Sequence, residues 1–302
     1  MSQDQATARS RMRVLMDAPG MIRAVNVYDA FSARVAQDAG FKAIGLGGFQ
    51  LGAQRCVTEP TLTMTEVIDS ARLITQAVSI PLKVDCGAGF GEPVHVTRTV
   101  REAEAAGIAC IHIEDQHYPK RAHYHEGIEK IIPVEDMLDK IRAALAARRN
   151  PDFIIVGRTD AMRTHGPAEA IRRANLYREA GCDMIECFPN NLEQVQLAVK
   201  EIAAPLLYVN SPGNRHNRVV FSWNELEDMG YKMTLDSTCV LLTAARALRK
   251  NLREYMATGR PPANVDEGPE LRHWVETIIG LPELYEIESR TTEKSCLSTN
   301  CA

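Results

Sequence analysis

The sequence lacks the cysteine patterns and the long apolar runs that mark several classes of protein. It has eight cysteines, but no two are spaced as a CxxC pair, so neither a zinc site nor a disulfide framework is indicated. The segment from Met1 to Gly20 is polar and charged, and no apolar run is long enough to span a bilayer. We therefore expect no signal peptide, no membrane contact and a cytoplasmic location.

A strong excess of charge of one sign is also absent. The net charge is -4 and the isoelectric point is near 6.1, which argues against binding to nucleic acid or to a membrane surface. With 45% hydrophobic and 25% charged residues, the composition is that of an ordinary globular protein. A chain of 302 residues can bury a large core, either as one barrel-sized domain or as two smaller ones.

What the sequence does have is a regular alternation of strand and helix patterns. Eight such strand-helix units, with polar residues gathered after the strands, favour an (α/β)8 TIM barrel over an open sheet. A doubly wound sheet is the alternative, but its GxGxxG motif is missing from the first strand-helix turn. The eight predicted strands, each followed by a helical pattern, are 22–27, 41–46, 80–85, 108–114, 153–157, 183–188, 205–210 and 232–235.

The predicted barrel occupies residues 1–260, and it includes an N-terminal helix over residues 3–18. Residues 261–302 are predicted to be a C-terminal helical extension and tail of the same domain, with a helix around 271–279. We expect these extra helices to pack on the barrel or on a neighbouring subunit. Residues 291–302 are small and polar, and we expect them to be disordered.

Two successive predicted strands end in carboxylates. Asp85 precedes a glycine loop at residues 87–91, and Glu114 ends the next strand. The loop that follows, residues 116–130, is rich in basic and imidazole side chains. A single strand-end acid often does no more than cap a helix or face solvent. Because the pattern is repeated beside a basic loop, it favours a site for a divalent ion and an anionic substrate.

Several short motifs carry a resemblance to a known family. They are Tyr28-Asp29-Ala30-Phe31-Ser32-Ala33, Gly89-Phe90-Gly91, Ile113-Glu114-Asp115-Gln116, Pro119-Lys120-Arg121 and Gly157-Arg158-Thr159-Asp160-Ala161. Their order and spacing, over roughly residues 10–250, resemble the isocitrate lyase / phosphoenolpyruvate mutase superfamily. The resemblance implies an (α/β)8 barrel with Mg²⁺, or Mn²⁺ in its place, at the strand ends. It also implies cleavage or formation of C–C or C–P bonds in 2-oxo or 2-hydroxy acids. It further implies a homotetramer in which a C-terminal helix is swapped between subunits.

The resemblance also implies roles for individual residues. Asp85 corresponds to the direct Mg²⁺ ligand, Glu114 to the acid that orients a metal-bound water, and Glu59 to a position where the family usually has Asp. Arg158 corresponds to the arginine that clamps the oxo-acid carboxylate, a task suited to its planar fork. The remaining matches are the carboxylate-binding loop Gly47, Gly48 and Phe49, and the start of a mobile gating loop at Lys120 and Arg121.

The sequence departs from the family pattern at three places. The usual Asp-x-Asp pair reads Asp85-Cys86-Gly87, so one carboxylate is missing. The lyase signature Lys-Lys/Arg-Cys-Gly-His reads Lys120-Arg121-Ala122-His123-Tyr124, which contains neither the lyase cysteine nor the mutase asparagine. Near the sixth and seventh strands, the family's acidic and Asn positions read Phe188-Pro189 and Val209-Asn210-Ser211, and Asn210 is a further candidate for substrate binding.

Retro-aldol cleavage of a 2-hydroxy acid needs a base, a Lewis acid and a proton donor. The base would be a metal-linked water or Tyr28, which is equally well read as a half-buried aromatic at a helix start. His123 and His125 lie where the lyase acid would be, and imidazole suits proton transfer near neutral pH. The alternative for either histidine is a residue of a polar surface loop with no catalytic role.

Three functions are compatible with this pattern. The first is a Mg²⁺-dependent lyase that cleaves a C–C bond of a 2-hydroxy di- or tricarboxylic acid resembling methylisocitrate or dimethylmalate. The second is decarboxylation or hydrolysis of an oxaloacetate-like acid, or C–P chemistry on phosphonopyruvate, which needs no cysteine acid. The third is a non-catalytic binding relative that has lost its metal. The joint presence of Asp85, Glu114 and Arg158 speaks against the third.

Overall fold

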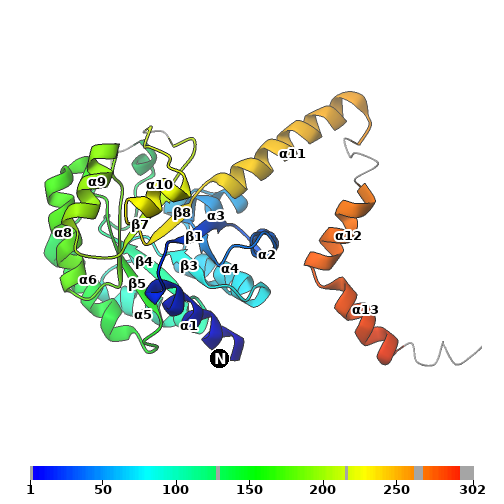
Figure 1. The fold of residues 1–302 in the computed structure, drawn as a ribbon, viewed down its shortest axis with the longest axis horizontal. Helices are drawn as coiled ribbons and strands as arrows, with labels where there is room; N and C mark the ends of the chain where they lie inside the picture. The colour runs from blue at the N-terminus through cyan, green and yellow to red at the C-terminus, as the bar shows by residue number, and fades with distance from the viewer. Residues whose placement is uncertain (1–2, 127–129, 215–216, 262–267, 293–302) are drawn as a thin grey trace, which may run out of the picture. The chain divides into compact units, whose positions relative to one another are not determined.

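The computed structural model shows a closed barrel of eight parallel strands (Figure 1). Each strand pairs with the next along the chain and β8 pairs with β1, so the expected TIM barrel is confirmed. The structure describes residues 3–126, 130–214, 217–261 and 268–292. The strands are β1 (Ile22–Val27), β2 (Ala43–Leu46), β3 (Leu82–Asp85), β4 (Cys110–Glu114), β5 (Ile154–Thr159), β6 (Met184–Cys187), β7 (Leu206–Asn210) and β8 (Met233–Asp236).

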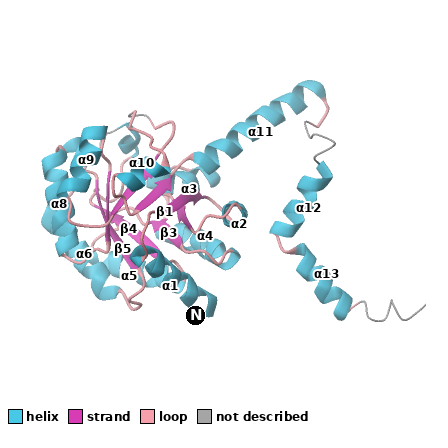
Figure 2. Cartoon of the chain, in the orientation of Figure 1, coloured by secondary structure: helices cyan, strands magenta, loops and turns pink. Residues whose placement is uncertain are grey.

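A helix follows each strand, and the helices after β1 to β7 surround the strands (Figure 2). Their apolar faces pack against the outside of the barrel in one large core. After β1 to β8 in turn, the principal helices are α2 (Ala30–Asp38), α4 (Met64–Ala77), α5 (Pro93–Ala105), α6 (Val134–Ala147), α8 (Pro167–Glu179), α9 (Leu192–Glu201), α10 (Trp223–Asp228) and α11 (Cys239–Thr258).

Capping side chains set where the first helices begin. The Asp29 carboxylate accepts a hydrogen bond from the Ser32 backbone N–H at 2.7 Å, so α2 starts at Ala30 and not at Tyr28 as its apolar pattern predicts. Thr63 caps α4 in the same way, and Glu66 completes the capping box. The observed strands begin and end within about two residues of the predicted bounds.

Four short helices lie in three of the loops that follow the strands, where the sequence predicts no helix. Each of these three loops contributes residues to the pocket described below, so the short helices determine how parts of the site are presented. They are α3 (Gly48–Gln54), η1 (Glu59–Thr61), η2 (Ala122–Glu126) and α7 (Ala161–Thr164).

The barrel interior forms a second apolar core. Side chains from the strands, including Ile22, Met184 and Met233, fill it together with Met12. Met12 belongs to the N-terminal helix α1 (Gln3–Asp17), which the sequence predicts over residues 3–18. Arg9 of the same helix is buried, and its Nε donates to the Ile108 carbonyl at 3.2 Å. Helix α1 therefore packs against the residues at the start of the strands.

The chain forms two compact units, residues 1–243 and residues 244–302. The second unit contains most of α11, then α12 (Gly268–Ile278) and α13 (Leu281–Arg290), so it holds one helix more than the tail predicts. Residues 293–302, most of the segment expected to be disordered, lie outside the described residues. None of the helices in the described part of the chain is both long and apolar enough to cross a membrane.

Candidate active site

A pocket opens beyond the carboxyl ends of the barrel strands, where the site of a TIM-barrel enzyme is expected. Its lining includes residues that lie on or just after each of the eight strands, and many of them are charged. Seven of the predicted site residues line it: Gly47, Gly48, Phe49, Glu59, Asp85, Lys120 and Arg158.

Asp85 ends β3 with its carboxylate held from several sides. Its Oδ1 accepts from the Gly87 backbone N–H at 2.8 Å and lies 2.7 Å from His112 Nε2. Its Oδ2 accepts a longer bond, 3.5 Å, from the Gly48 backbone N–H. Burial disfavours the charged carboxylate, but His112, Lys120 and Arg158 outweigh burial and lower the pKa of Asp85 well below its usual range. Asp85 is therefore anionic at neutral pH.

Glu114 at the end of β4 is shared between two cations. Arg158 Nη1 lies 3.1 Å from Glu114 Oε2, and Lys120 Nζ lies 2.9 Å from Glu114 Oε1. Lys120 also forms an ion pair with Glu59, so one ammonium joins two acids. Burial raises the pKa of Glu114 to about 7, against the opposing effects of Arg158 and Lys120. Burial also opposes the charge on Lys120, but Glu114 and Glu59 outweigh it and raise its pKa.

The acids at this end of the pocket fit a divalent cation that prefers oxygen ligands. Asp85, His112 and Glu114 each bring a ligand atom within 4.8 Å of the others. Mg²⁺ and Mn²⁺ prefer oxygen ligands, so the carboxylates of Asp85, Glu114 and Glu59 would suit either ion better than the His112 ring, which bonds to Asp85 and Glu186. A Cβ built at Gly87 would meet none of the described atoms within 4 Å, so the space beside this position is open.

A side chain in place of Gly47 or Gly48 would require a neighbouring side chain to move. A Cβ at Gly47 would lie 2.3 Å from Gln50 Oε1, and one at Gly48 would lie 2.3 Å from Glu59 Cγ. Gly47 precedes the first turn of α3, and Gly48 begins it. The two glycines therefore allow the backbone to run directly along the pocket wall.

Arg158 lies on β5 near the middle of the pocket lining. Besides Glu114, its guanidinium contacts Asp160 Oδ1 at 3.1 Å and lies over the Phe188 ring, 4.4 Å from the ring centroid. Burial opposes its charge, but Asp160, Glu114 and Glu186 outweigh burial and raise the pKa of Arg158 well above its usual value. Arg158 is a permanent cation with its orientation set before any ligand arrives.

Of the other predicted site residues that the structure describes, Glu114 is buried and paired with Lys120 and Arg158, which do line the pocket. Tyr28, Arg121, His123 and Asn210 are not part of the lining. Tyr28 is half-buried, and burial, aided by Asp29, raises its pKa. Arg121 and His123 are exposed, and the side chain of His125 lies outside the described part of the chain. Asn210 is buried, where it donates to the Phe221 carbonyl at 2.9 Å and accepts from the Phe221 N–H at 3.2 Å. In this structure Asn210 thus holds the segment that follows β7.

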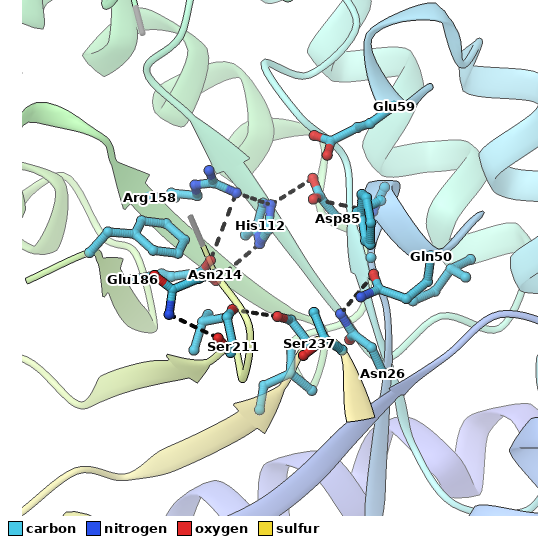
Figure 3. Close-up of a pocket in the computed structure, with 18 of the residues that line it drawn as sticks. Asn26, Gln50, Glu59, Asp85, His112, Arg158, Glu186, Ser211, Asn214 and Ser237 are labelled. Atoms are coloured by element: carbon cyan, nitrogen blue, oxygen red, sulfur yellow. Dashed lines mark hydrogen bonds and ion pairs between the residues drawn. The ribbon is translucent and has the colours of Figure 1, made fainter. Parts of the chain in front are cut away.

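A buried charged network that the sequence analysis missed lies against the site. Lys83 Nζ is 2.8 Å from Glu186 Oε2 and 2.6 Å from His112 Nδ1, while His112 Nδ1 is 3.0 Å from the same glutamate oxygen. Figure 3 shows His112 joined to Asp85, Glu186 and Arg158. The available signal was a charged residue inside each of two apolar strands, two positions before Asp85 and two positions before Phe188.

Comparison with known proteins gives consistent matches over most of the chain. A family model described as phosphoenolpyruvate phosphomutase matches residues 12–256. The 2,3-dimethylmalate lyase of Eubacterium barkeri is 37% identical over 243 residues, which cover 79% of this chain and 83% of that protein. The 2-methylisocitrate lyase of Aeropyrum pernix is 36% identical over 252 residues, which cover 82% and 80%. A crystal structure of phosphonopyruvate hydrolase with oxalate and Mg²⁺ has a TM-score of 0.82 at 26% identity, covering 95% and 99%.

Proposed function

The chain belongs to the phosphoenolpyruvate phosphomutase family, and we propose that it is a Mg²⁺-dependent lyase that cleaves a C–C bond of a 2-hydroxy di- or tricarboxylic acid. The observation that carries the proposal is the convergence of Asp85, Glu114 and Glu59 with Arg158 at one end of the pocket. A site for a 2-hydroxy acid needs acidic residues that hold a divalent cation. It also needs a cationic residue that binds the substrate carboxylate. The relatives named dimethylmalate lyase and methylisocitrate lyase support the same class of substrate.

The residues of the chain divide the task of retro-aldol cleavage among them. When bound by the three acids, Mg²⁺ supplies the Lewis acid for the developing enolate. Arg158 and the backbone of Gly47 and Gly48 bind and orient the substrate carboxylate. Tyr28, if it turns toward the pocket, takes the hydroxyl proton as the carbonyl forms and the C–C bond breaks. The bond electrons remain on the departing carbon, which a proton donor of the loop at residues 117–130 then protonates.

The loop at residues 117–130 has a defined base. Its ends meet where Gln116 bridges to Ile131 and the His117 N–H donates to the Lys130 carbonyl at 2.8 Å. Lys120 is buried and reaches Glu59 and Glu114, whereas Arg121 and His123 face outward. We therefore propose that closure of the loop over a ligand brings Arg121 and His123 or His125 to the substrate and excludes water.

A second candidate is decarboxylation or hydrolysis of an oxaloacetate-like acid, or C–P chemistry on phosphonopyruvate. The observation that favours it is that none of the six cysteines among the described residues lines the pocket, so no thiol there is placed to act as the acid. The resemblance to phosphonopyruvate hydrolase is consistent with it. A non-catalytic binding relative is the third candidate. The joint presence of Asp85, Glu114 and Arg158 in one site speaks against it.

We further propose a cytoplasmic homo-oligomer, a tetramer in which the C-terminal helices are exchanged between subunits. Leu248, Leu252 and Met256 recur every four residues on α11, and Met256 is 89% exposed. Leu284, Tyr285 and Ile287 are exposed on α13. Exposed apolar side chains repeated along one helix face indicate a surface that another chain covers.

The experiment that tests the proposed function is a substrate screen with and without metal. Purified protein is offered a panel of 2-hydroxy and 2-oxo di- and tricarboxylates, with Mg²⁺ or with a chelator, and the products are identified. We expect C–C cleavage that needs Mg²⁺ and that Asp85→Ala abolishes. Release of CO₂ or phosphate instead would favour the second candidate. Full turnover by Asp85→Ala in the presence of chelator would remove the metal from the proposal.

A further inference from the structure

Arg218, in the segment after β7, lines the same pocket and is buried. Its Nη2 donates to Ser211 Oγ at 3.2 Å, and its guanidinium lies over the Phe188 ring, 4.8 Å from the ring centroid. Its Nη1 is buried and has no hydrogen-bond partner among the described residues. A buried donor without a partner costs stability unless a ligand satisfies it.

The charge of Arg218 is also unbalanced. Lys83, Lys120 and Arg158 in the same pocket each form an ion pair with a carboxylate. In the part of the chain that the structure describes, no carboxylate lies within ion-pair distance of Arg218. Burial lowers the pKa of Arg218, and the nearby charge of Arg158 lowers it further. Burial and the charge of Arg218 together lower the pKa of Arg163, which also lines the pocket. An anion bound beside these groups would relieve both effects.

The surroundings of Arg218 are suited to a carboxylate. Ser211 Oγ lies 2.5 Å from Ser237 Oγ, so two hydroxyls stand beside the guanidinium. Ser211, Asn214 and Ser237 gather on the side of the pocket away from Glu59 (Figure 3). Arg158 and Arg218 both contact the Phe188 ring, which therefore holds two guanidinium groups in one pocket.

We propose that Arg218 and Ser211 form a subsite for a second carboxylate of the substrate, remote from the acids around Asp85. This inference rests on the proposed function and narrows its substrate class: one carboxylate binds at Arg158 and another at Arg218. Monocarboxylic 2-hydroxy acids would leave Arg218 buried and unpaired, and would be rejected for that reason.

Lactate and malate provide a matched pair of probes, because both are 2-hydroxy acids and malate carries one more carboxylate. Binding of each to the full chain is measured by calorimetry with Mg²⁺ present, for wild type and for Arg218→Gln. We expect malate to bind wild type about tenfold or more tightly than lactate, and we expect Arg218→Gln to remove most of that preference. Lactate affinity should stay within about twofold. Arg142→Gln removes an exposed guanidinium on α6 and serves as the control.

Three outcomes overturn the subsite: equal binding of lactate and malate by wild type, an unchanged preference in Arg218→Gln, or an equal loss of both ligands. If Arg218→Gln does not fold, as judged by circular dichroism, Ser211→Ala should still lower malate affinity selectively, and its failure to do so counts against the proposal. Inorganic phosphate is a third probe. Binding of phosphate that depends on Arg218 and is tighter than that of malate would overturn the assignment to a carboxylate. If malate is preferred in an Arg218-dependent way but the substrate screen finds no C–C cleavage, the proposed function is wrong and the subsite still stands.

Discussion

Lys83 and Glu186 form an ion pair across the inside of the barrel, with Nζ and Oε2 2.8 Å apart and both side chains buried. Their strands, β3 and β6, are not neighbours in the sheet. Removing one partner would leave the other charge buried and uncompensated, which typically costs about 3–5 kcal/mol.

We therefore expect Lys83→Met and Glu186→Leu each to lower the free energy of unfolding by about that amount. The double variant should recover most of the loss, because both charges are then gone. Urea unfolding of the four proteins in a double-mutant cycle measures the coupling. Losses that simply add in the double variant would show that the two side chains do not depend on each other.

Arg158→Lys should not restore function. A point ammonium cannot reproduce the guanidinium fork that reaches Glu114 and Asp160 and is expected to clamp the substrate carboxylate. Losing such a contact typically costs about 2–5 kcal/mol in kcat/KM. Steady-state kinetics on the identified substrate measures it, with the exposed Arg172→Lys as control. Kinetics equal to wild type would assign Arg158 a purely structural role.

The cysteines should divide sharply in reactivity. Burial raises the pKa of Cys110, Cys182 and Cys187 to about 12, so at pH 8 these groups remain thiols and lack the reactive thiolate. Cys56 and Cys239 are exposed. Iodoacetamide followed by peptide mass spectrometry should label the exposed pair first, and the buried ones only on unfolding. Labelling of Cys187 as fast as Cys56 would mean that the barrel opens readily.

The placement of Asp85, Glu114 and Arg158 beside one another could be predicted from the sequence, because these residues lie at or near the ends of successive strands. Asp85, Glu114 and Arg158 each follow an apolar run, and parallel strands bring their carboxyl ends to one edge. The closed barrel was also predictable, because eight alternating strand-helix units are compatible with few other arrangements.

Other features depend on contacts that no local pattern announces. Lys83 and Glu186 pair between strands that are not adjacent, so neither residue alone predicts the contact. Arg218 lies in an irregular segment that Asn210 holds through hydrogen bonds to Phe221. The roles expected for Tyr28, His123 and His125 remain predictions.

The loop at residues 117–130 should matter more for catalysis than for stability, because its base is closed and loop deletions cost little folding free energy. His123→Asn and His125→Asn, made one at a time, test which residue protonates the departing carbon. We expect one of them to lower both the rate and the stereospecific uptake of solvent deuterium. If neither change alters rate or stereochemistry, the acid comes from elsewhere and the decarboxylase-like function gains weight.

Assembly should depend on the apolar face of α11. Leu252→Glu places a charge among exposed apolar side chains, and a charge at the centre of an interface without a partner is unfavourable. Analytical ultracentrifugation should show a smaller species than for wild type. Lys250→Glu, also exposed on α11, is the control. A mass for Leu252→Glu that equals that of wild type would exclude this face from the interface.

The close contacts of Gly47 and Gly48 have a consequence for changing the substrate by directed evolution. A side chain at either position would have to displace Gln50 and Asn26, or Glu59, so libraries there would also rearrange the pocket wall. Phe188, Ser211 and Leu242 line the pocket without such a restriction from the backbone. Variation meant to change the substrate should therefore begin at Phe188, Ser211 and Leu242, because a change at Gly47 or Gly48 would also move Gln50, Asn26 or Glu59.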